Sequence, residues 1–208
     1  MAFVRLDPAH IGSNLERVRE RIGQEVRICA AIKYVPADEL STLIEAGIEI
    51  VGENRAQDLV EKQDRLGRDA FREWHFIGAL QSRKVRDVAP RVDLIHSVAS
   101  DSALKQLENH PARAVLIQVN VAGEEGKAGI APGELGDFVA RCPVPVTGLM
   151  TMPPFTERPE ESRPHFAALA ELATEHGLRE LSMGTTQDFE VAVQEGATIV
   201  RLGTVLYE

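Results

Sequence analysis

Apolar residues along this chain recur in two alternating patterns. Residues 7–22 place Ile11, Leu15, Val18 and Ile22 three and four positions apart among charged residues, which predicts an amphipathic helix. Eight short apolar runs follow, and each is too short for a helix that is buried on all sides. We expect these runs to be strands, at residues 26–32, 48–51, 74–77, 93–96, 114–121, 145–150, 180–183 and 198–202.

The segments between the runs have helical patterns or helix boundary signals. Pro36 precedes a helical stretch that ends at Gly47, and Phe166, Leu169 and Ala173 share one face of a longer helix. We expect helices at residues 37–47, from after residue 54 to about 65, at 81–90, from residue 100, at 132–141, around residues 166–173 and at about 187–195. Strands that alternate with helices pair in parallel through right-handed crossovers.

Eight such units in one chain of 208 residues favour a single domain over residues 1–208. We therefore predict an α/β fold, a (β/α)8 barrel of the TIM type with an extra N-terminal helix. An open doubly wound sheet is the alternative, but no GxGxxG motif follows the first strand and the sequence has no P-loop.

Composition restricts the class of protein. A formal net charge of −9 and an aromatic content of 5% argue against binding to nucleic acid or to anionic lipid. The sequence has no apolar run long enough to span a membrane and no secretory leader, so we expect a cytoplasmic protein. We also expect a monomer. Cys29 and Cys142 form no CxxC or Cys/His cluster, so we expect reduced thiols and no metal site.

Catalytic and ligand residues of such a barrel lie where the strands end. Among the five lysines, Lys33 alone directly follows an apolar strand, whereas Lys62, for example, falls on a helix. Burial at the barrel mouth would favour a neutral amine, which is the form that reacts with an aldehyde to give a Schiff base. A lysine that extends from a strand end into water is the alternative.

The last two strands end in loops that combine glycine with hydroxyl groups. These loops are residues 182–186 and 201–204, and their amides and hydroxyls could bind a phosphate. Lys33 would lie beside them once the barrel closes. Together they indicate a pocket for a phosphorylated aldehyde, and pyridoxal 5'-phosphate (PLP) is the main candidate. Arg201 would point into the same pocket, unless it pairs with a carboxylate at the rim.

Motifs along nearly the whole chain resemble those of the pyridoxal phosphate homeostasis proteins, whose barrel is similar to the N-terminal domain of bacterial alanine racemase. The resemblance rests on Ala31-Ile32-Lys33, Gly52-Glu53-Asn54, Trp74-His75-Phe76-Ile77-Gly78, Ile95-His96-Ser97-Val98, Gln118-Val119-Asn120, Gly148-Leu149-Met150-Thr151-Met152, Ser182-Met183-Gly184 and Arg201-Leu202-Gly203-Thr204. The sequence differs from the family pattern at Ile32, where serine is commoner, and at Thr185-Thr186, where Met-Ser is usual.

The resemblance implies a role for each residue of the site. Lys33 would hold PLP as a Schiff base, and Arg201 would lie near the pyridine nitrogen. The residues implied for binding the phosphate or shaping its loop are Thr186, Gly203, Thr204, Ser182 and Gly184. Asn54 and Met150 are implied to line the pocket. The same resemblance implies a PLP carrier in vitamin B6 and amino-acid homeostasis, with transient contact to PLP-dependent apo-enzymes.

A PLP-dependent amino-acid racemase is the alternative function. Racemisation needs a second acid or base opposite the lysine. Tyr34 follows Lys33 in a strand-like segment and is expected to face away from the pocket, while His75 and His96 could serve but are more simply interpreted as buried core residues. The sequence therefore favours a binding protein without a catalytic residue. A barrel that binds another phosphorylated metabolite without a Schiff base is a third possibility.

A basic segment offers a candidate surface for partners. Arg83, Lys84 and Arg86 fall on the predicted helix at residues 81–90, and Arg91 follows it. This segment could dock recipient enzymes, although charged residues on a solvated helix face are the simpler interpretation.

Overall fold

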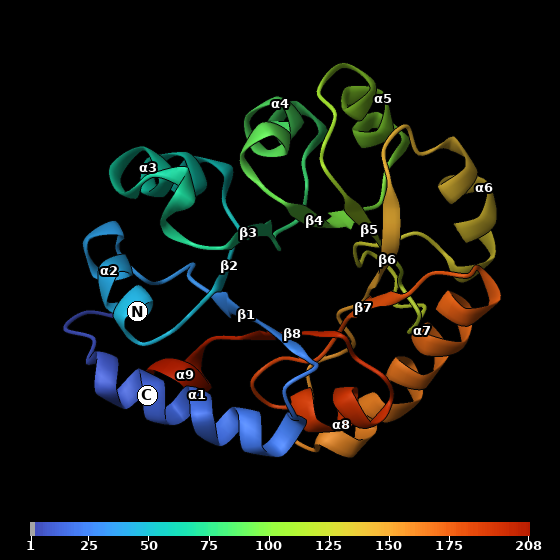
Figure 1. The fold of residues 1–208 in the computed structure, drawn as a ribbon. Coiled ribbons are helices and arrows are strands. Elements are labelled where there is room, and N and C mark those ends of the chain that lie inside the picture. Colours follow the sequence, from blue (N-terminus) through green and yellow to red (C-terminus); the bar gives the residue numbers. More distant parts are fainter. Residues whose placement is uncertain (1–2) are drawn as a thin grey trace.

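Eight parallel strands close into a barrel in which each strand pairs with the next and β8 pairs with β1. The computed structural model describes residues 3–208 (Figure 1). The (β/α)8 prediction is confirmed, and each of the eight apolar runs overlaps a strand. The strands are β1 (Arg27–Ala31), β2 (Ile50–Glu53), β3 (Glu73–Phe76), β4 (Leu94–Val98), β5 (Val115–Gln118), β6 (Val146–Met150), β7 (Glu180–Ser182) and β8 (Ile199–Leu202).

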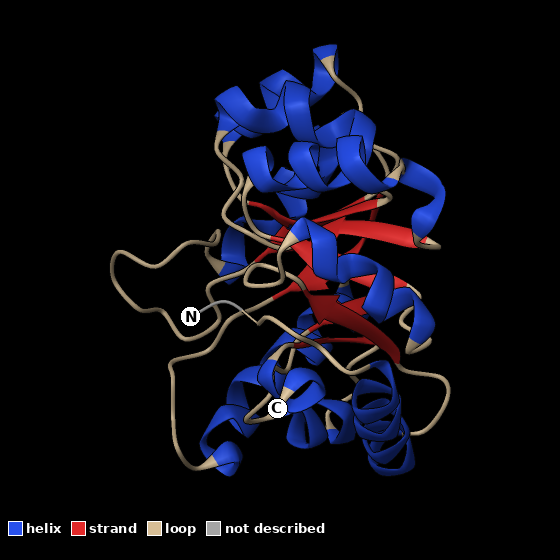
Figure 2. Cartoon of the chain, turned by 90° about the vertical axis from the view of Figure 1, so that its left-hand side faces the viewer, coloured by secondary structure: helices blue, strands red, loops and turns tan. Residues whose placement is uncertain are grey.

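Helices surround the barrel, and Figure 2 shows the strands enclosed between them. The α-helices are α1 (Pro8–Ile22), α2 (Leu40–Glu45), α3 (Ala56–Leu66), α4 (Val85–Val88), α5 (Asp101–Asn109), α6 (Leu135–Arg141), α7 (Arg163–Glu175), α8 (Phe189–Gln194) and α9 (Thr204–Tyr207). Short 3-10 turns occupy Ala37–Glu39, Arg68–Ala70, Ser82–Lys84, Ala89–Arg91, Pro132–Glu134 and Pro159–Ser162.

The extra N-terminal helix is confirmed as α1. Asp7 caps it by accepting a hydrogen bond from the amide of Ala9, Pro8 occupies the first turn, and Gly23 ends it at a φ of 80°. Its buried face packs against α8 and α9 (Figure 1). The helix thus covers the seam where the first and last strands of the barrel meet.

Two apolar layers hold the barrel together. The outer layer lies between strands and helices, and Trp74 and Phe166 are among its largest fully buried side chains. The inner layer fills the barrel with Cys29, Ile50, Leu94, Leu116, Met150 and Ile199. Strand positions alternate between these layers, as expected when a sheet is buried on both faces.

Some predicted helix boundaries are wrong. Residues 81–90 do not form one continuous helix. The α-helix α4 is only four residues long, and 3-10 turns at Ser82–Lys84 and Ala89–Arg91 flank it. Such short segments commonly tighten at their ends, where carbonyls find donors three residues away. The sequence analysis also missed α9, which directly follows β8.

Both cysteines are free thiols, as expected. Burial raises the pKa of Cys29 to about 12. Because the thiolate is the reactive form, Cys29 should resist alkylation in the folded protein. We expect a thiol reagent at mildly alkaline pH to modify Cys29 only after denaturation. Rapid modification of Cys29 in the native protein, located by peptide mass spectrometry, would contradict this packing.

Candidate functional site at the barrel mouth

A pocket of about 550 Å³ opens where β1, β2, β3 and β8 end, and we call it the mouth pocket. Its lining comes from both ends of the chain, because closure of the barrel places β1 beside β8. The lining residues are Phe3, Ala31, Lys33, Tyr34, Asn54, Ile77, Gly78, Met152, Thr185, Thr186, Gln187, Arg201, Gly203, Thr204 and Glu208. The sequence-predicted residues Lys33, Asn54, Thr186, Arg201, Gly203 and Thr204 therefore lie in one pocket.

Lys33 lies in a turn just beyond β1. The amide of Ile32 still continues the sheet by donating to the carbonyl of Gly52 at 2.9 Å, and the amide of Val35 closes the turn on the carbonyl of Ile32 at 3.0 Å. The Lys33 side chain is exposed, so the burial expected for it is not present in this structure. Its amine is open to a ligand that enters the pocket.

Tyr34 also lines the mouth pocket, and the prediction that it faces away is wrong. The prediction extended strand alternation past the end of β1, but Lys33 and Tyr34 lie in a turn, where successive side chains need not oppose each other. The Tyr34 ring centroid is 4.9 Å from Nζ of Lys33. A phenol therefore lies next to the pocket amine.

A buried ion pair supports Lys33 and Asn54 from behind. Lys62 donates from Nζ to the carbonyl of Ile32 at 2.7 Å and to Oε2 of Glu53 at 2.5 Å. The other oxygen of Glu53 accepts from the amide of Asn54 at 2.6 Å. Sequence reasoning missed Lys62, because its position on a helix says nothing about which strand end its amine reaches. One sequence signal could have indicated the pair: Glu53 ends a strand, and Lys62 has the opposite charge on the helix that follows it.

Asn54 lines the mouth pocket and carries an acceptor atom that has no partner among the described residues. Its Oδ1 is buried and, within residues 3–208, has no hydrogen-bond partner. Buried acceptors are nearly always paired in native proteins, so an unpaired one on a pocket wall fits a ligand donor or a water molecule. Gly78 lies against the backbone of Asn54, since a Cβ on Gly78 would come within 2.1 Å of the Asn54 carbonyl oxygen.

The predicted phosphate loops meet on the opposite wall. Thr186, Gly203 and Thr204 line the pocket together, and the amide of Gly203 lies 3.4 Å from Oγ1 of Thr186. Gly184 turns the first loop at a φ of 88°, and a Cβ there would come within 2.6 Å of Ala192. Amide and hydroxyl groups that converge in this way are suited to bind an anionic oxygen.

Arg201 is buried and held by several acceptors. Its NH1 donates to Oγ of Ser182 at 2.5 Å, and its NH2 donates to the carbonyl of Thr151 at 3.0 Å. The sulfur of Met152 lies 2.7 Å from the same NH2. Burial lowers the pKa of Arg201 to about 10, so the guanidinium remains charged at neutral pH. Within residues 3–208, Arg201 makes no ion pair with a carboxylate, so the alternative of a pairing at the rim is wrong.

Three predicted residues do not line the mouth pocket. Met150 is 2% exposed and belongs to the apolar layer inside the barrel, and Met152 is the methionine that reaches the pocket wall. Ser182 is fully buried beneath the pocket, where it contacts Arg201. Gly184 shapes the loop that carries Thr186. These residues support the pocket from below or behind.

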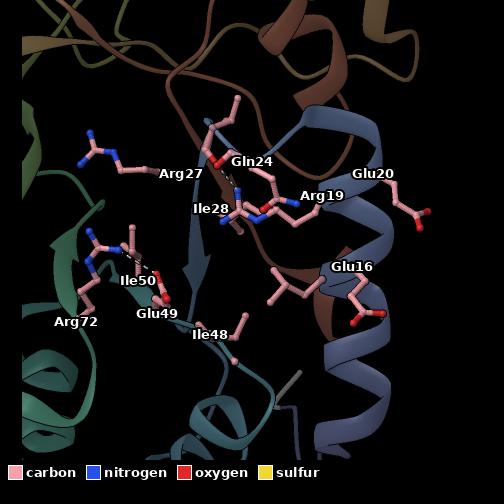
Figure 3. A pocket seen from close by; sticks show the side chains of 13 residues that line it. Glu16, Arg19, Glu20, Gln24, Arg27, Ile28, Ile48, Glu49, Ile50 and Arg72 are labelled. Carbon is pink, nitrogen blue, oxygen red and sulfur yellow. Dashed lines mark hydrogen bonds and ion pairs between the residues drawn. The ribbon is translucent and has the colours of Figure 1, made fainter.

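A second cavity, of about 650 Å³, lies at the opposite end of the barrel between α1 and the starts of β1 and β2 (Figure 3). Its cationic side chains already have partners. Arg72 pairs with Glu49 at 3.2 Å, and Arg19 donates to the carbonyl of Val26. Residues at this end of a (β/α)8 barrel serve stability more often than chemistry, so the mouth pocket is the candidate site.

The composition of the mouth pocket indicates what it can bind. An exposed amine, a loop of amides and hydroxyls and an unpaired buried acceptor suit a phosphorylated carbonyl compound. Within residues 3–208, no cluster of three or more histidine, cysteine or carboxylate side chains is suited to hold a metal ion. None of the helices described is long and apolar enough to cross a membrane.

Comparison with known proteins places the chain in a family. The model of the alanine racemase N-terminal domain matches residues 6–208. The pyridoxal phosphate homeostasis protein of Aquifex aeolicus is 42% identical over 214 residues, which covers 93% of each chain. This chain belongs to the pyridoxal phosphate homeostasis protein family. The family member of Escherichia coli K12 is 34% identical over 95% of each chain.

A solved structure in this family has the same fold. PipY of Synechococcus elongatus, solved with PLP bound, aligns with a TM-score of 0.83 at 32% identity and covers 95% of this chain and 100% of its own. Membership in the pyridoxal phosphate homeostasis protein family confirms the resemblance that the sequence motifs predicted. The motif segments at the ends of β1, β2, β3, β6 and β8 contribute residues to the lining of the mouth pocket.

Proposed function

We propose that this protein binds PLP in the mouth pocket through Lys33 and acts in PLP and amino-acid homeostasis as a carrier. The observation that carries the proposal is the convergence of an accessible Lys33 amine with the Thr186 and Gly203 loops in one pocket. The unpaired Oδ1 of Asn54 supports the fit, because PLP has a ring hydroxyl that can donate to such an acceptor. The PLP-bound structure of PipY supports it independently.

Each pocket residue has a proposed task. The amine of Lys33 condenses with the PLP aldehyde, forming a C=N bond with loss of one water molecule. Thr186, Gly203 and Thr204 bind the phosphate. Arg201 would lie near the ring nitrogen, and Asn54 would contact the ring substituents. Met150, Ser182 and Gly184 support these groups without lining the pocket.

PLP itself supplies an electron sink that can stabilise negative charge on a bound amine. A guanidinium at the ring nitrogen is a donor and cannot accept the ring proton, so Arg201 would keep the ring unprotonated and weaken that sink. This arrangement favours holding the cofactor over catalysing reactions with it.

Replacing Lys33 with alanine tests the proposal directly. We expect the purified wild-type protein to absorb visible light from bound PLP, and Lys33→Ala to lose that absorption. After borohydride reduction, peptide mass spectrometry should find the pyridoxyl group on Lys33. Lys127→Ala removes a half-exposed lysine elsewhere and is the matched control. A wild-type protein without an adduct on Lys33 would favour a barrel that binds another phosphorylated metabolite.

The racemase alternative gains one candidate residue from the structure. Tyr34 lies beside Lys33 in the mouth pocket and could act as a second acid or base. Incubation with L-alanine in deuterated water separates the two functions. The carrier proposal predicts negligible exchange of the α-proton, whereas sustained exchange that is lost in Tyr34→Phe would establish catalysis.

The carrier proposal includes transient contact with PLP-dependent apo-enzymes by a monomer in the cytoplasm. Free thiols at Cys29 and Cys142 are typical of a reducing compartment. Arg83, Lys84 and Arg86 line a groove together with Asp87, which lies 3.5 Å from Nε of Arg86, and this groove could dock an acidic partner. If it does, reversing the charges of Arg83 and Lys84 should slow PLP transfer to an apo-enzyme. Unchanged transfer rates would exclude this groove.

A further inference from the structure

A line of hydrogen-bonded polar side chains crosses the apolar barrel interior and ends at Arg201. We call it the core chain, and its members are Glu73 and His75 on β3, His96 on β4 and Ser182 on β7. Both histidines and Ser182 are fully buried. Because β4 and β7 are not neighbouring strands, the contact between His96 and Ser182 spans the inside of the barrel.

Each contact of the core chain has hydrogen-bonding length. Oγ of Ser182 lies 2.8 Å from Nδ1 of His96. Nε2 of His96 lies 3.0 Å from Nδ1 of His75. Nε2 of His75 lies 2.8 Å from Oε2 of Glu73. Arg201 then donates to Ser182 at 2.5 Å, so the line is continuous from a carboxylate to the guanidinium.

The two ends determine the direction of every hydrogen bond. A guanidinium can only donate, so Oγ of Ser182 accepts from Arg201. In the part of the chain that the structure describes, the remaining partner for the Ser182 hydroxyl proton is Nδ1 of His96. His96 must then carry its proton on Nε2 and donate to Nδ1 of His75. His75 in turn donates from Nε2 to the carboxylate of Glu73.

Electrostatics agree with this direction. Burial, followed by the nearby His75, Arg201 and Arg27, lowers the pKa of His96 well below its ordinary value, so this ring is neutral. The hydrogen bond from His75 is the largest cause that lowers the pKa of Glu73, so the acceptor end of the chain is ionised. A neutral ring carries one proton, which leaves one nitrogen to donate and one to accept.

We propose that the core chain positions Arg201 in the mouth pocket, with His96 and Ser182 as positioning residues. With its proton engaged by His96, Ser182 is fixed as an acceptor and holds NH1 of Arg201, while the carbonyl of Thr151 holds NH2. Because both terminal nitrogens of the guanidinium are held, its positive charge and its remaining N–H groups have a fixed position relative to the ligand. This inference rests on the proposed function, in which that ligand is PLP.

Histidine tautomers in the cofactor-free protein provide the first test. In nitrogen-15 NMR of histidine-labelled protein at neutral pH, we expect His75 and His96 each to have a bare Nδ1 and a protonated Nε2. Assignment uses His75→Phe and His96→Phe. A protonated Nδ1 or an imidazolium at either ring would overturn the proposed direction. This result does not depend on PLP, so it is separate from the test of Lys33.

The second test compares the binding of PLP with that of an analogue that lacks the ring nitrogen. We expect His96→Phe and Ser182→Ala to weaken PLP binding about tenfold, the size of one lost hydrogen bond to a buried charge. Binding of the PLP analogue with carbon in place of the ring nitrogen should change much less, because Arg201 has no acceptor to reach there. Equal losses for both ligands would show a merely structural role and overturn the inference.

Two further variants complete the design. His165→Phe changes a histidine on α7 and should alter neither the tautomer signals of the core chain nor the binding of either ligand. Ser182→Ala removes a single hydroxyl, so it tests the proposal if the larger change in His96→Phe prevents folding. Should Lys33→Ala bind PLP as tightly as wild type, the proposed function fails, while the tautomer result remains valid.

Discussion

Replacing Lys62 with methionine is expected to lower the free energy of unfolding by about 3–5 kcal/mol, the typical cost of leaving one partner of a buried ion pair uncompensated. The Glu53 side chain is fully buried and pairs with Lys62 at 2.5 Å, so the variant would leave a carboxylate without its countercharge. The carbonyl of Ile32 would also lose its donor, directly before Lys33. We therefore also expect slower capture of PLP. Urea denaturation and stopped-flow absorbance would measure the two effects.

The double variant Glu53→Leu, Lys62→Met distinguishes pairing from packing. Because it removes both charges, it should be more stable than Lys62→Met alone. Lys105→Met changes an exposed lysine on α5 and should be nearly neutral. If Lys62→Met unfolds at the same urea concentration as Lys105→Met, the buried pair contributes little and its role in supporting Lys33 is excluded.

Gly78→Ala is expected to reduce both stability and PLP binding. The added methyl group would come within 2.1 Å of the Asn54 carbonyl oxygen and 2.7 Å of its Cα, so backbone must move. Overpacking of this kind costs about 1–3 kcal/mol or more. The displaced Asn54 lines the mouth pocket, so we expect weaker PLP binding as well. Thermal unfolding and absorbance titration with PLP would measure the two losses.

Gly12→Ala is the matched control for this substitution. Gly12 lies within α1, where an added Cβ would meet the carbonyl oxygen of Ala46 at an ordinary 3.6 Å. Alanine favours a helix by about 1 kcal/mol over glycine, so this variant should gain stability and bind PLP normally. Gly78→Ala with unchanged binding would show that Asn54 is not required in the pocket.

The fold could be predicted because its signals are local. Each strand of this barrel is buried on both faces and so appears as a short apolar run, and α1 has its N-cap and its apolar face within residues 7–22. Boundaries were less accurate where tertiary contacts decide them. The run at 114–121 forms a strand only over Val115–Gln118, because Val119 then pairs with Ile130 in an isolated bridge.

Site residues that lie at the ends of strands could be predicted from the sequence. Residues whose role depends on contacts between distant segments were missed. Lys33, Gly203 and Thr204 lie within two residues of the ends of β1 and β8, so the barrel topology alone brought them together. Tyr34 was misplaced because it lies in a turn whose geometry the strand period does not determine. Lys62 was overlooked because its role depends on contacts with Ile32 and Glu53, which are formed only when α3 packs on the barrel.

Pairing of β1 with β8 makes the site a late product of chain synthesis. Lys33 is translated early, whereas the loop at Gly203 follows the last strand, so a nascent chain that still lacks β8 has no complete pocket. Ligand that binds the finished pocket connects the two edges of the seam and stabilises the closed barrel against opening there. PLP bound by Lys33 and by the loop at Gly203 would then link the first and last strands of the barrel.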